Sequence, residues 1–133
     1  MLKRDEINIR DPFVLVHEGK YYLYGTRGNE CWGKGTGLDC YVSTDLKSFE
    51  NPVVVFLPPD DFWADKNFWA PEVHEYKGAF YMLVSFKADG KCRGTQILKA
   101  SLSACMTLSA NGFPSGDVWL FPVMYFVHSY RPA

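Results

Sequence analysis

The chain has 133 residues, a formal net charge of −1 and a pI near 6.3, so it lacks the basic surplus expected of a nucleic-acid partner. Its 47% hydrophobic and 22% charged residues are typical of one folded domain and exclude intrinsic disorder. The longest apolar run, Val118 to Val127, is about half of the ~20 residues that span a bilayer, which argues against a membrane protein.

The first ten residues carry several charged side chains and no apolar core, unlike a signal peptide. We therefore expect a cytoplasmic protein. The four cysteines form no C-x-x-C pair and have no histidine at zinc-finger spacing, so free buried thiols are expected rather than disulfides. These cysteines are Cys31, Cys40, Cys92 and Cys105.

After a polar start over residues 1–8, a β-hairpin is predicted over about Pro12 to Thr26. Asp11 precedes Pro12, and the residue before a proline is held extended, so no helix begins here. An apolar run and an aromatic-rich run then flank a Glu-Gly-Lys turn centred on Gly19, which is a hairpin signal.

Two more strands are predicted after a glycine-rich loop at residues 27–37. They cover Leu38 to Ser43 and Phe49 to Phe56, with a turn from Asp45 between them. The loop lacks the spacing of a phosphate-binding loop and no helix follows it, so we expect a flexible loop. Four short strands without a helical period indicate one small antiparallel sheet.

The chain then repeats its opening hairpin at a constant offset of 71 − 12 = 59 residues. The matched pairs are Pro12 with Pro71, Val14 with Val73, Gly19 with Gly78, Tyr21 with Phe80, Tyr22 with Tyr81 and Leu23 with Met82. A weaker echo at 98 − 41 = 57 residues relates the run from Tyr41 to the run from Leu98.

A four-stranded unit that recurs at this length is typical of a propeller blade. The sequence therefore predicts an all-β chain of four-stranded antiparallel blades, in a single partial domain over residues 1–133. The first blade covers about residues 9–57 and the second about residues 69–104. Propellers have about 4 to 8 blades, so about two blades make an incomplete propeller.

The segment 105–133 departs from this pattern. Between Met106 and Tyr130 the only acidic or basic side chain is Asp117. One interpretation is a further strand that bends at Pro122 and is buried against the second sheet. The other is that the segment is not the natural continuation of the fold, because of a truncation or a change of reading frame.

Asp11 is the candidate for chemistry, since it stands where the first strand of a blade begins and such strands line the central channel of a propeller. An aspartate is ordinarily ionised at neutral pH and can take a proton from water as a general base. The alternative is a structural Asp that caps the backbone of the turn.

As a set, the motifs of residues 7–104 resemble the start of glycoside hydrolase family 43. The segments that carry this resemblance are Ile9-Arg10-Asp11-Pro12-Phe13, Gly19-Lys20-Tyr21-Tyr22-Leu23, Val42-Ser43-Thr44-Asp45-Leu46, Trp69-Ala70-Pro71-Glu72-Val73 and Gly78-Ala79-Phe80-Tyr81-Met82. The family includes arabinanases, β-xylosidases and α-L-arabinofuranosidases, and its fold is a five-bladed propeller with a central active-site funnel.

The resemblance implies an inverting glycosidase that hydrolyses arabinose- or xylose-containing saccharides without a cofactor. Asp11 would be the general base, whereas the general acid and an Asp that tunes it belong to later blades and are not assigned here. Trp69, next to the position equivalent to Asp11, would form a wall of the sugar subsite, with core packing as the alternative. Trp32 is a weaker candidate for the same rim. Glu72 is expected to be structural.

Other side chains point to no further chemistry. The three histidines, His17, His74 and His128, share no ligand spacing, so no metal site is predicted. Two blades leave sheet edges open, which offers a route to self-association. Because the general acid is not assigned and only about two blades are present, we expect this chain to be inactive alone. The rival functions are a non-catalytic carbohydrate-binding fragment or an assembly partner.

Overall fold

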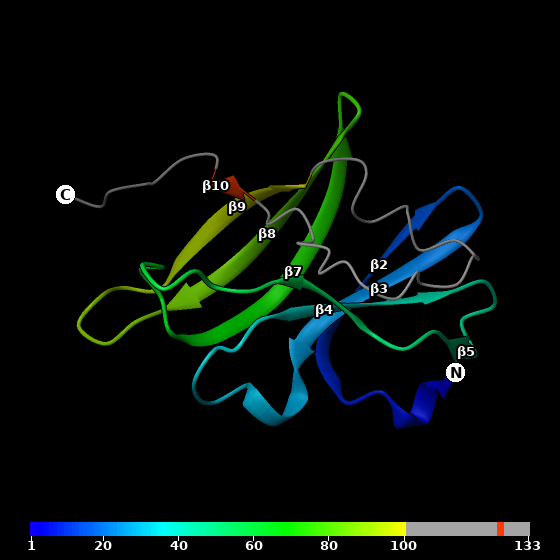
Figure 1. The fold of residues 1–133 in the computed structure, drawn as a ribbon, viewed down its shortest axis with the longest axis horizontal. Helices are drawn as coiled ribbons and strands as arrows, with labels where there is room; N and C mark the ends of the chain where they lie inside the picture. The colour runs from blue at the N-terminus through cyan, green and yellow to red at the C-terminus, as the bar shows by residue number, and fades with distance from the viewer. Residues whose placement is uncertain (101–124, 127–133) are drawn as a thin grey trace, which may run out of the picture.

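The computed structural model describes residues 1–100 and 125–126, which form two four-stranded antiparallel sheets and one small strand pair. The first sheet has the order β2-β3-β4-β6 and the second the order β10-β9-β8-β7. Figure 1 shows the first sheet, blue to green, beside the second, green to yellow. The chain is therefore all-β with two blade-like sheets, as predicted.

The opening hairpin consists of β2 (Ile9–His17) and β3 (Lys20–Arg27), so it begins earlier than the predicted Pro12. Its turn residues Glu18 and Gly19 both have positive φ, 46° and 73°. This is the signature of a type I′ turn, whose twist matches that of the flanking strands. The predicted hairpin is confirmed.

The rest of the first sheet consists of β4 (Leu38–Ser43), as predicted, and β6 (Val53–Phe56). The predicted fourth strand from Phe49 is wrong in its first half, because Pro52 has no N–H to give to a ladder. Instead β5 (Ser48–Phe49) pairs with β1 (Leu2–Lys3), which lies beside it near the N-terminus (Figure 1). The polar start is thus part of the fold, and a 3₁₀ turn, η1 (Arg4–Glu6), follows it.

The second sheet repeats this plan. Its strands are β7 (Lys66–Tyr76), β8 (Ala79–Lys87), β9 (Gly94–Ala100) and the two-residue β10 (Tyr125–Phe126). The hairpin turn at Lys77-Gly78 again has two positive φ values, 49° and 72°. The same local turn chemistry therefore closes both hairpins.

Strand register confirms both sequence offsets. Val14 pairs with Leu23 in the first sheet, as Val73 pairs with Met82 in the second. Leu23 then pairs with Tyr41, as Met82 pairs with Leu98. The offset falls from 59 to 57 across the second connection, because the turn at residues 88–93 is shorter than the loop at residues 28–37.

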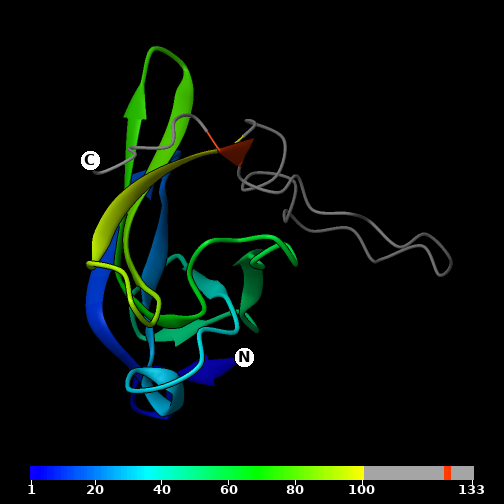
Figure 2. The same cartoon turned by 90° about the vertical axis from the view of Figure 1, so that its left-hand side faces the viewer.

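The two sheets share one aromatic core. β7 lies against both β2 and β3, and the long strands of the two sheets run side by side (Figure 2). Phe56 of the first sheet meets Phe86 of the second at a ring-centroid distance of 5.7 Å, and Phe68 meets Phe86 at 4.8 Å. Trp63 anchors the loop before β7, since its Nε1 donates to Gln96 Oε1 at 2.7 Å.

The predicted cysteine states are corrected in part. Cys31 and Cys40 are buried thiols that form no disulfide within the described residues, but the Cys92 thiol is exposed because it lies in the short turn before β9. Cys105 lies outside the described residues, as does the segment 105–133 apart from β10, so its two interpretations stay predictions. No helix in the described part of the chain is long and apolar enough to cross a bilayer.

Candidate functional site

Asp11 lies in a bulge of β2 with its backbone in the left-handed region. Its φ is 49°, and the ladder to β3 shifts register between Arg10 and Phe13. Ala70, 59 residues later, has the same φ of 49° at a matching register shift of β7. Bulges of this kind re-aim a side chain. Both blades therefore contain the same bulge with a residue at positive φ, and only in the first blade does this residue carry a carboxylate.

Thr26 links Asp11 to the second sheet. The Thr26 side chain is 1% exposed, and its Oγ1 donates to Asp11 Oδ2 at 3.2 Å while it accepts from the Ala70 N–H at 2.9 Å. This chain of hydrogen bonds fixes one carboxylate oxygen. Asp11 Oδ1 has no hydrogen-bond partner among the described residues, and the residue is exposed, so this oxygen can accept a hydrogen bond from water.

Sequence reasoning did not single out Thr26. The signal available to it was weak: a hydroxyl residue that follows the aromatic run of β3 and directly opposes Arg10. Arg10 itself points toward the loop, where its Nη1 donates to Cys31 Sγ at 3.4 Å. This contact, together with the nearby Asp11 charge, raises the pKa of Arg10 above its ordinary value.

Trp69 and Trp32, the two predicted wall residues, lie against each other. Their rings meet edge to face at a centroid distance of 5.0 Å and an interplanar angle of 84°. Trp69 Nε1 donates to the Cys31 carbonyl at 2.5 Å, which fixes the indole, whereas Trp32 is 74% exposed. The more strongly fixed ring is thus Trp69, and the more accessible ring is Trp32.

Arg93, from the turn before β9, covers the Trp69 ring. Its Cζ lies 3.7 Å from the ring centroid, and its Nη1 donates to Asn67 O at 3.2 Å and to Ser85 Oγ at 3.1 Å. Partial burial lowers the pKa of Arg93 from its ordinary value. No sequence motif identifies this contact, because the two residues meet only after β7, β8 and β9 have paired.

The glycine-rich loop is docked on β7, which contradicts the expectation of a flexible loop. The Gly35 N–H donates to Asp65 O at 2.8 Å, and the Asn67 N–H donates to Gly33 O at 2.9 Å. Gly35 also lies directly on the Phe68 ring, where a Cβ would overlap the ring atoms. Glycine lets the loop approach this closely, and the docked loop places Trp32 beside Trp69.

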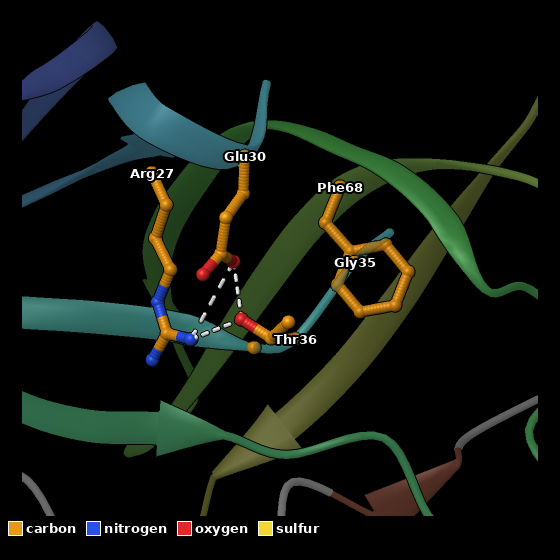
Figure 3. A pocket seen from close by; sticks show the side chains of 6 residues that line it. Arg27, Glu30, Gly35, Thr36 and Phe68 are labelled. Atoms are coloured by element: carbon orange, nitrogen blue, oxygen red, sulfur yellow. Dashed lines mark hydrogen bonds and ion pairs between the residues drawn. The ribbon is translucent and has the colours of Figure 1, made fainter. Parts of the chain in front are cut away.

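A charged network beneath this loop completes its support (Figure 3). Arg27 binds Asp39 through two hydrogen bonds of 2.8 and 2.6 Å, and its Nη1 donates to Thr36 Oγ1 at 2.6 Å. Thr36 in turn donates to Glu30. The Asp39 hydrogen bonds raise the pKa of Arg27. The Arg27, Thr36 and Glu30 side chains line a small hollow and hydrogen-bond to one another there. We therefore assign this network to positioning the loop.

Two further predictions concern the role of Glu72 and the binding of a metal ion. Glu72 is exposed, and its Oε2 lies 3.4 Å from His74 Nε2, with no contact to Asp11. Within the described residues no group of three or more His, Cys, Asp or Glu side chains is arranged to hold a metal ion. The site therefore consists of one oriented carboxylate from β2, two indoles from β7 and the glycine-rich loop, and one guanidinium from the turn before β9.

Comparison with known proteins identifies the family. The sequence profile described as glycosyl hydrolases family 43 matches residues 6–108. The chain is 30% identical over 94 residues to an extracellular exo-α-(1→5)-L-arabinofuranosidase of Cellvibrio japonicus, a match that covers 65% of this chain and 24% of that protein.

Solved structures agree. An endo-arabinase from Bacteroides thetaiotaomicron superposes with a TM-score of 0.64 at 34% identity, covering 74% of this chain and 33% of that one. A thermostable family-43 glycoside hydrolase gives a TM-score of 0.60 at 29% identity, covering 70% and 29%. The chain thus spans between about a quarter and a third of these relatives, and the predicted incomplete propeller is confirmed. It belongs to glycosyl hydrolase family 43.

Proposed function

We propose that this chain supplies the base-bearing part of an inverting glycosidase that acts on arabinose- or xylose-containing saccharides. Asp11 is the general base, and Trp69 with Trp32 forms the wall of a sugar subsite. The observation that carries the proposal is the oriented Asp11 carboxylate, which Thr26 ties to the strand that bears Trp69. The names of the arabinofuranosidase and endo-arabinase relatives favour arabinose-containing substrates.

Inversion requires two carboxyl groups about 6.5–9.5 Å apart, with a water between the base and the sugar. Asp11 Oδ1 removes a proton from this water while the water oxygen attacks the anomeric carbon. A second carboxylic acid gives its proton to the leaving oxygen. We assign no such acid among the described residues, because exposed Glu72 contacts His74 and belongs to no shared site with Asp11.

The isolated chain is therefore predicted not to hydrolyse aryl arabinofuranosides or aryl xylosides, whose leaving groups benefit from a general acid. Glycosyl fluorides offer a sharper test, since fluoride departs without protonation and needs only the base. We expect fluoride release from α-L-arabinofuranosyl fluoride, with β-D-xylopyranosyl fluoride assayed beside it, accelerated within the ~10²–10⁴-fold range of general-base help and lost in Asp11→Ala.

One control variant and two contrary outcomes define this test. Asp5→Ala removes an exposed carboxylate with no side-chain partner in the described part of the chain, and it should leave fluoride release unchanged. Equal release by the parent and Asp11→Ala would contradict the base assignment. Turnover of an aryl glycoside that disappears in Asp11→Ala would contradict the predicted inactivity of the isolated chain.

A second candidate function is a non-catalytic carbohydrate-binding unit, favoured by the 74% exposure of the Trp32 ring. Indole faces stack on sugar rings without any need for Asp11. Calorimetry with xylo- and arabino-oligosaccharides separates the two functions. Binding that is lost in Trp69→Ala and kept in Asp11→Ala, without fluoride release by the parent, would favour the binding unit, whereas no heat at all would remove it.

Partner and location remain separate predictions. Self-association through the open sheets is tested by mass measurement in solution, where a monomer at every concentration would contradict it. Cytoplasmic location also stays a prediction, and the Cellvibrio relative is described as extracellular. Fractionation of the source cells with a tagged chain would decide between the two compartments.

A further inference from the structure

Arg93 is held at one nitrogen only. Its Nη1 donates to Asn67 O and Ser85 Oγ, whereas its Nε and Nη2 have no acceptor among residues 1–100. A guanidinium has five N–H donors in a fixed plane, so the Nε/Nη2 edge presents two parallel donors. The guanidinium that carries this edge lies over the Trp69 ring, next to the proposed sugar subsite.

The chain itself shows what such an edge binds. Arg27 uses Nε and Nη2 to hold the two oxygens of Asp39, at 2.8 and 2.6 Å, while its Nη1 donates to the Thr36 hydroxyl. Arg93 has the same division of labour, with the Ser85 hydroxyl at Nη1. Arg27 has a carboxylate at its Nε/Nη2 edge, whereas Arg93 has none among the described residues.

The neighbouring charges do not supply that carboxylate. Asp89, in the same turn, is paired with Lys66. No ion pair to Arg93 occurs in the described part of the chain. The Trp69 face also removes water from one side of the guanidinium, which strengthens its attraction for an anion relative to a fully solvated arginine.

We propose that Arg93 is a specificity-determining residue that selects saccharides bearing a carboxylate, such as a uronic acid substituent. This inference rests on the proposed function, because it places the acidic sugar beside the Trp69–Trp32 wall. The sugar ring packs against the accessible Trp32 indole, and its carboxylate accepts two hydrogen bonds from the Nε/Nη2 edge of Arg93.

The test compares two saccharides of similar size by calorimetry on the 133-residue chain. One is xylotetraose, and the other is xylotriose that carries a single glucuronic acid. We expect the acidic saccharide to bind about fivefold more tightly, the upper range for an exposed charge pair. The preference should vanish in about 0.5 M NaCl, where screening is strong.

Substitutions separate recognition from mere support of Trp69. Arg93→Met keeps the packing stem and should abolish the preference for the acidic saccharide, while Arg93→Lys should keep part of it through charge without the two-point geometry. Arg4→Met, a change of another exposed arginine remote from Trp69, is the matched control and should keep the full preference. Near-ultraviolet circular dichroism verifies the fold of each variant.

The outcomes are distinct. Binding of both saccharides without preference in the parent chain would overturn the role of Arg93 and leave the proposed function intact. Equal weakening of both saccharides in Arg93→Met would show that Arg93 only positions Trp69. Binding of neither saccharide by the parent chain would overturn this inference, and the proposed function would be contradicted only if arabino-oligosaccharides gave no heat and the glycosyl fluorides released no fluoride as well.

Discussion

At the residue scale, Thr26 connects the candidate base Asp11 to the second sheet. Its hydroxyl serves the Asp11 carboxylate on one side and the Ala70 N–H on the other, so a single buried atom joins the two blades at the base. Such a group is costly to remove, since both partners lose a hydrogen bond and one belongs to a backbone with no alternative nearby.

Thr26→Val keeps the shape of the side chain and removes the hydroxyl. We expect a loss of about 1–2 kcal/mol in the free energy of unfolding, because the Ala70 N–H is left without its acceptor. Denaturant unfolding measures this loss. Thr26→Ser, which retains the hydroxyl, should be clearly more stable than Thr26→Val, and the reverse order would show that packing of the methyl group dominates.

At the scale of elements, the glycine-rich loop behaves as part of the second sheet. Backbone hydrogen bonds join it to Asp65 and Asn67, and Gly35 lies flat on Phe68. The loop carries Cys31 and Trp32, so its docking decides where the candidate wall stands. A loop without regular structure is thus positioned by main-chain contacts instead of its own propensity.

Gly35→Ala tests this docking. The added methyl group would overlap the Phe68 ring, so we expect destabilisation of about 1–3 kcal/mol, as for overpacked cores. Gly33→Ala is the matched control, since a Cβ there meets nothing within 4 Å. Thermal unfolding measures the melting temperatures of the two variants, and we expect the lower value for Gly35→Ala. Equal melting temperatures would mean that the loop moves away from Phe68 at little cost in free energy.

The turn after β4 contains a carboxylate, Asp45, whose ionised form accepts backbone hydrogen bonds. Asp45 accepts hydrogen bonds from the backbone N–H groups of Ser48, at 2.9 Å, and Lys47, at 2.8 Å, which lower the pKa of its carboxyl. A lowered pKa means that the ionised form stabilises the fold. This stability is present above the unfolded-state pKa and is lost as pH falls through the folded-state value.

Asp45→Asn removes the charge and keeps an acceptor oxygen. We expect it to lower the melting temperature at neutral pH, with a gap to the parent that closes as the pH falls below the ordinary carboxyl pKa and through the lowered folded-state value. Asp5→Asn, an exposed carboxylate without a side-chain partner in the described residues, should show no such convergence. A gap that stays constant with pH would show that the Asp45 charge contributes nothing.

At the scale of the whole molecule, the two sheets bury one face each against a common aromatic core and leave other faces less covered. Val14 and Val16 of β2 are 39% and 64% exposed, on the face that also carries Leu23. Ile97 of β9 is 45% exposed. We infer that Val14 and Val16, neighbours on one face of an edge strand, favour association of this face with other protein.

Val16→Lys should therefore reduce self-association of the isolated chain, because a charge on this face opposes its burial. Sedimentation velocity over a range of concentrations measures the effect. Leu57→Lys, which changes a residue 58% exposed beyond the end of β6, is the control and should associate like the parent chain. Identical behaviour of both variants would contradict a role for the β2 face.

Most of the strands, the two hairpin turns, the repeat and the family can be predicted from the sequence alone. These features depend on neighbours along the chain: alternation of apolar side chains, glycine where φ must be positive, and motifs at constant offsets. Errors appeared where a local pattern competed with a distant partner, as when Phe49 joined Leu2 in a separate strand pair instead of extending β6.

The assembly of the site depends on tertiary contacts that the sequence does not reveal. Thr26 and Ala70, Cys31 and Trp69, and Arg93 and Trp69 are far apart in sequence, and each pair meets through strand register and bulges. No local preference encodes such a pair, because its free energy is gained only when both sheets have formed. Asp11 could be named from its motif, but the hydrogen bond that orients it required the second blade.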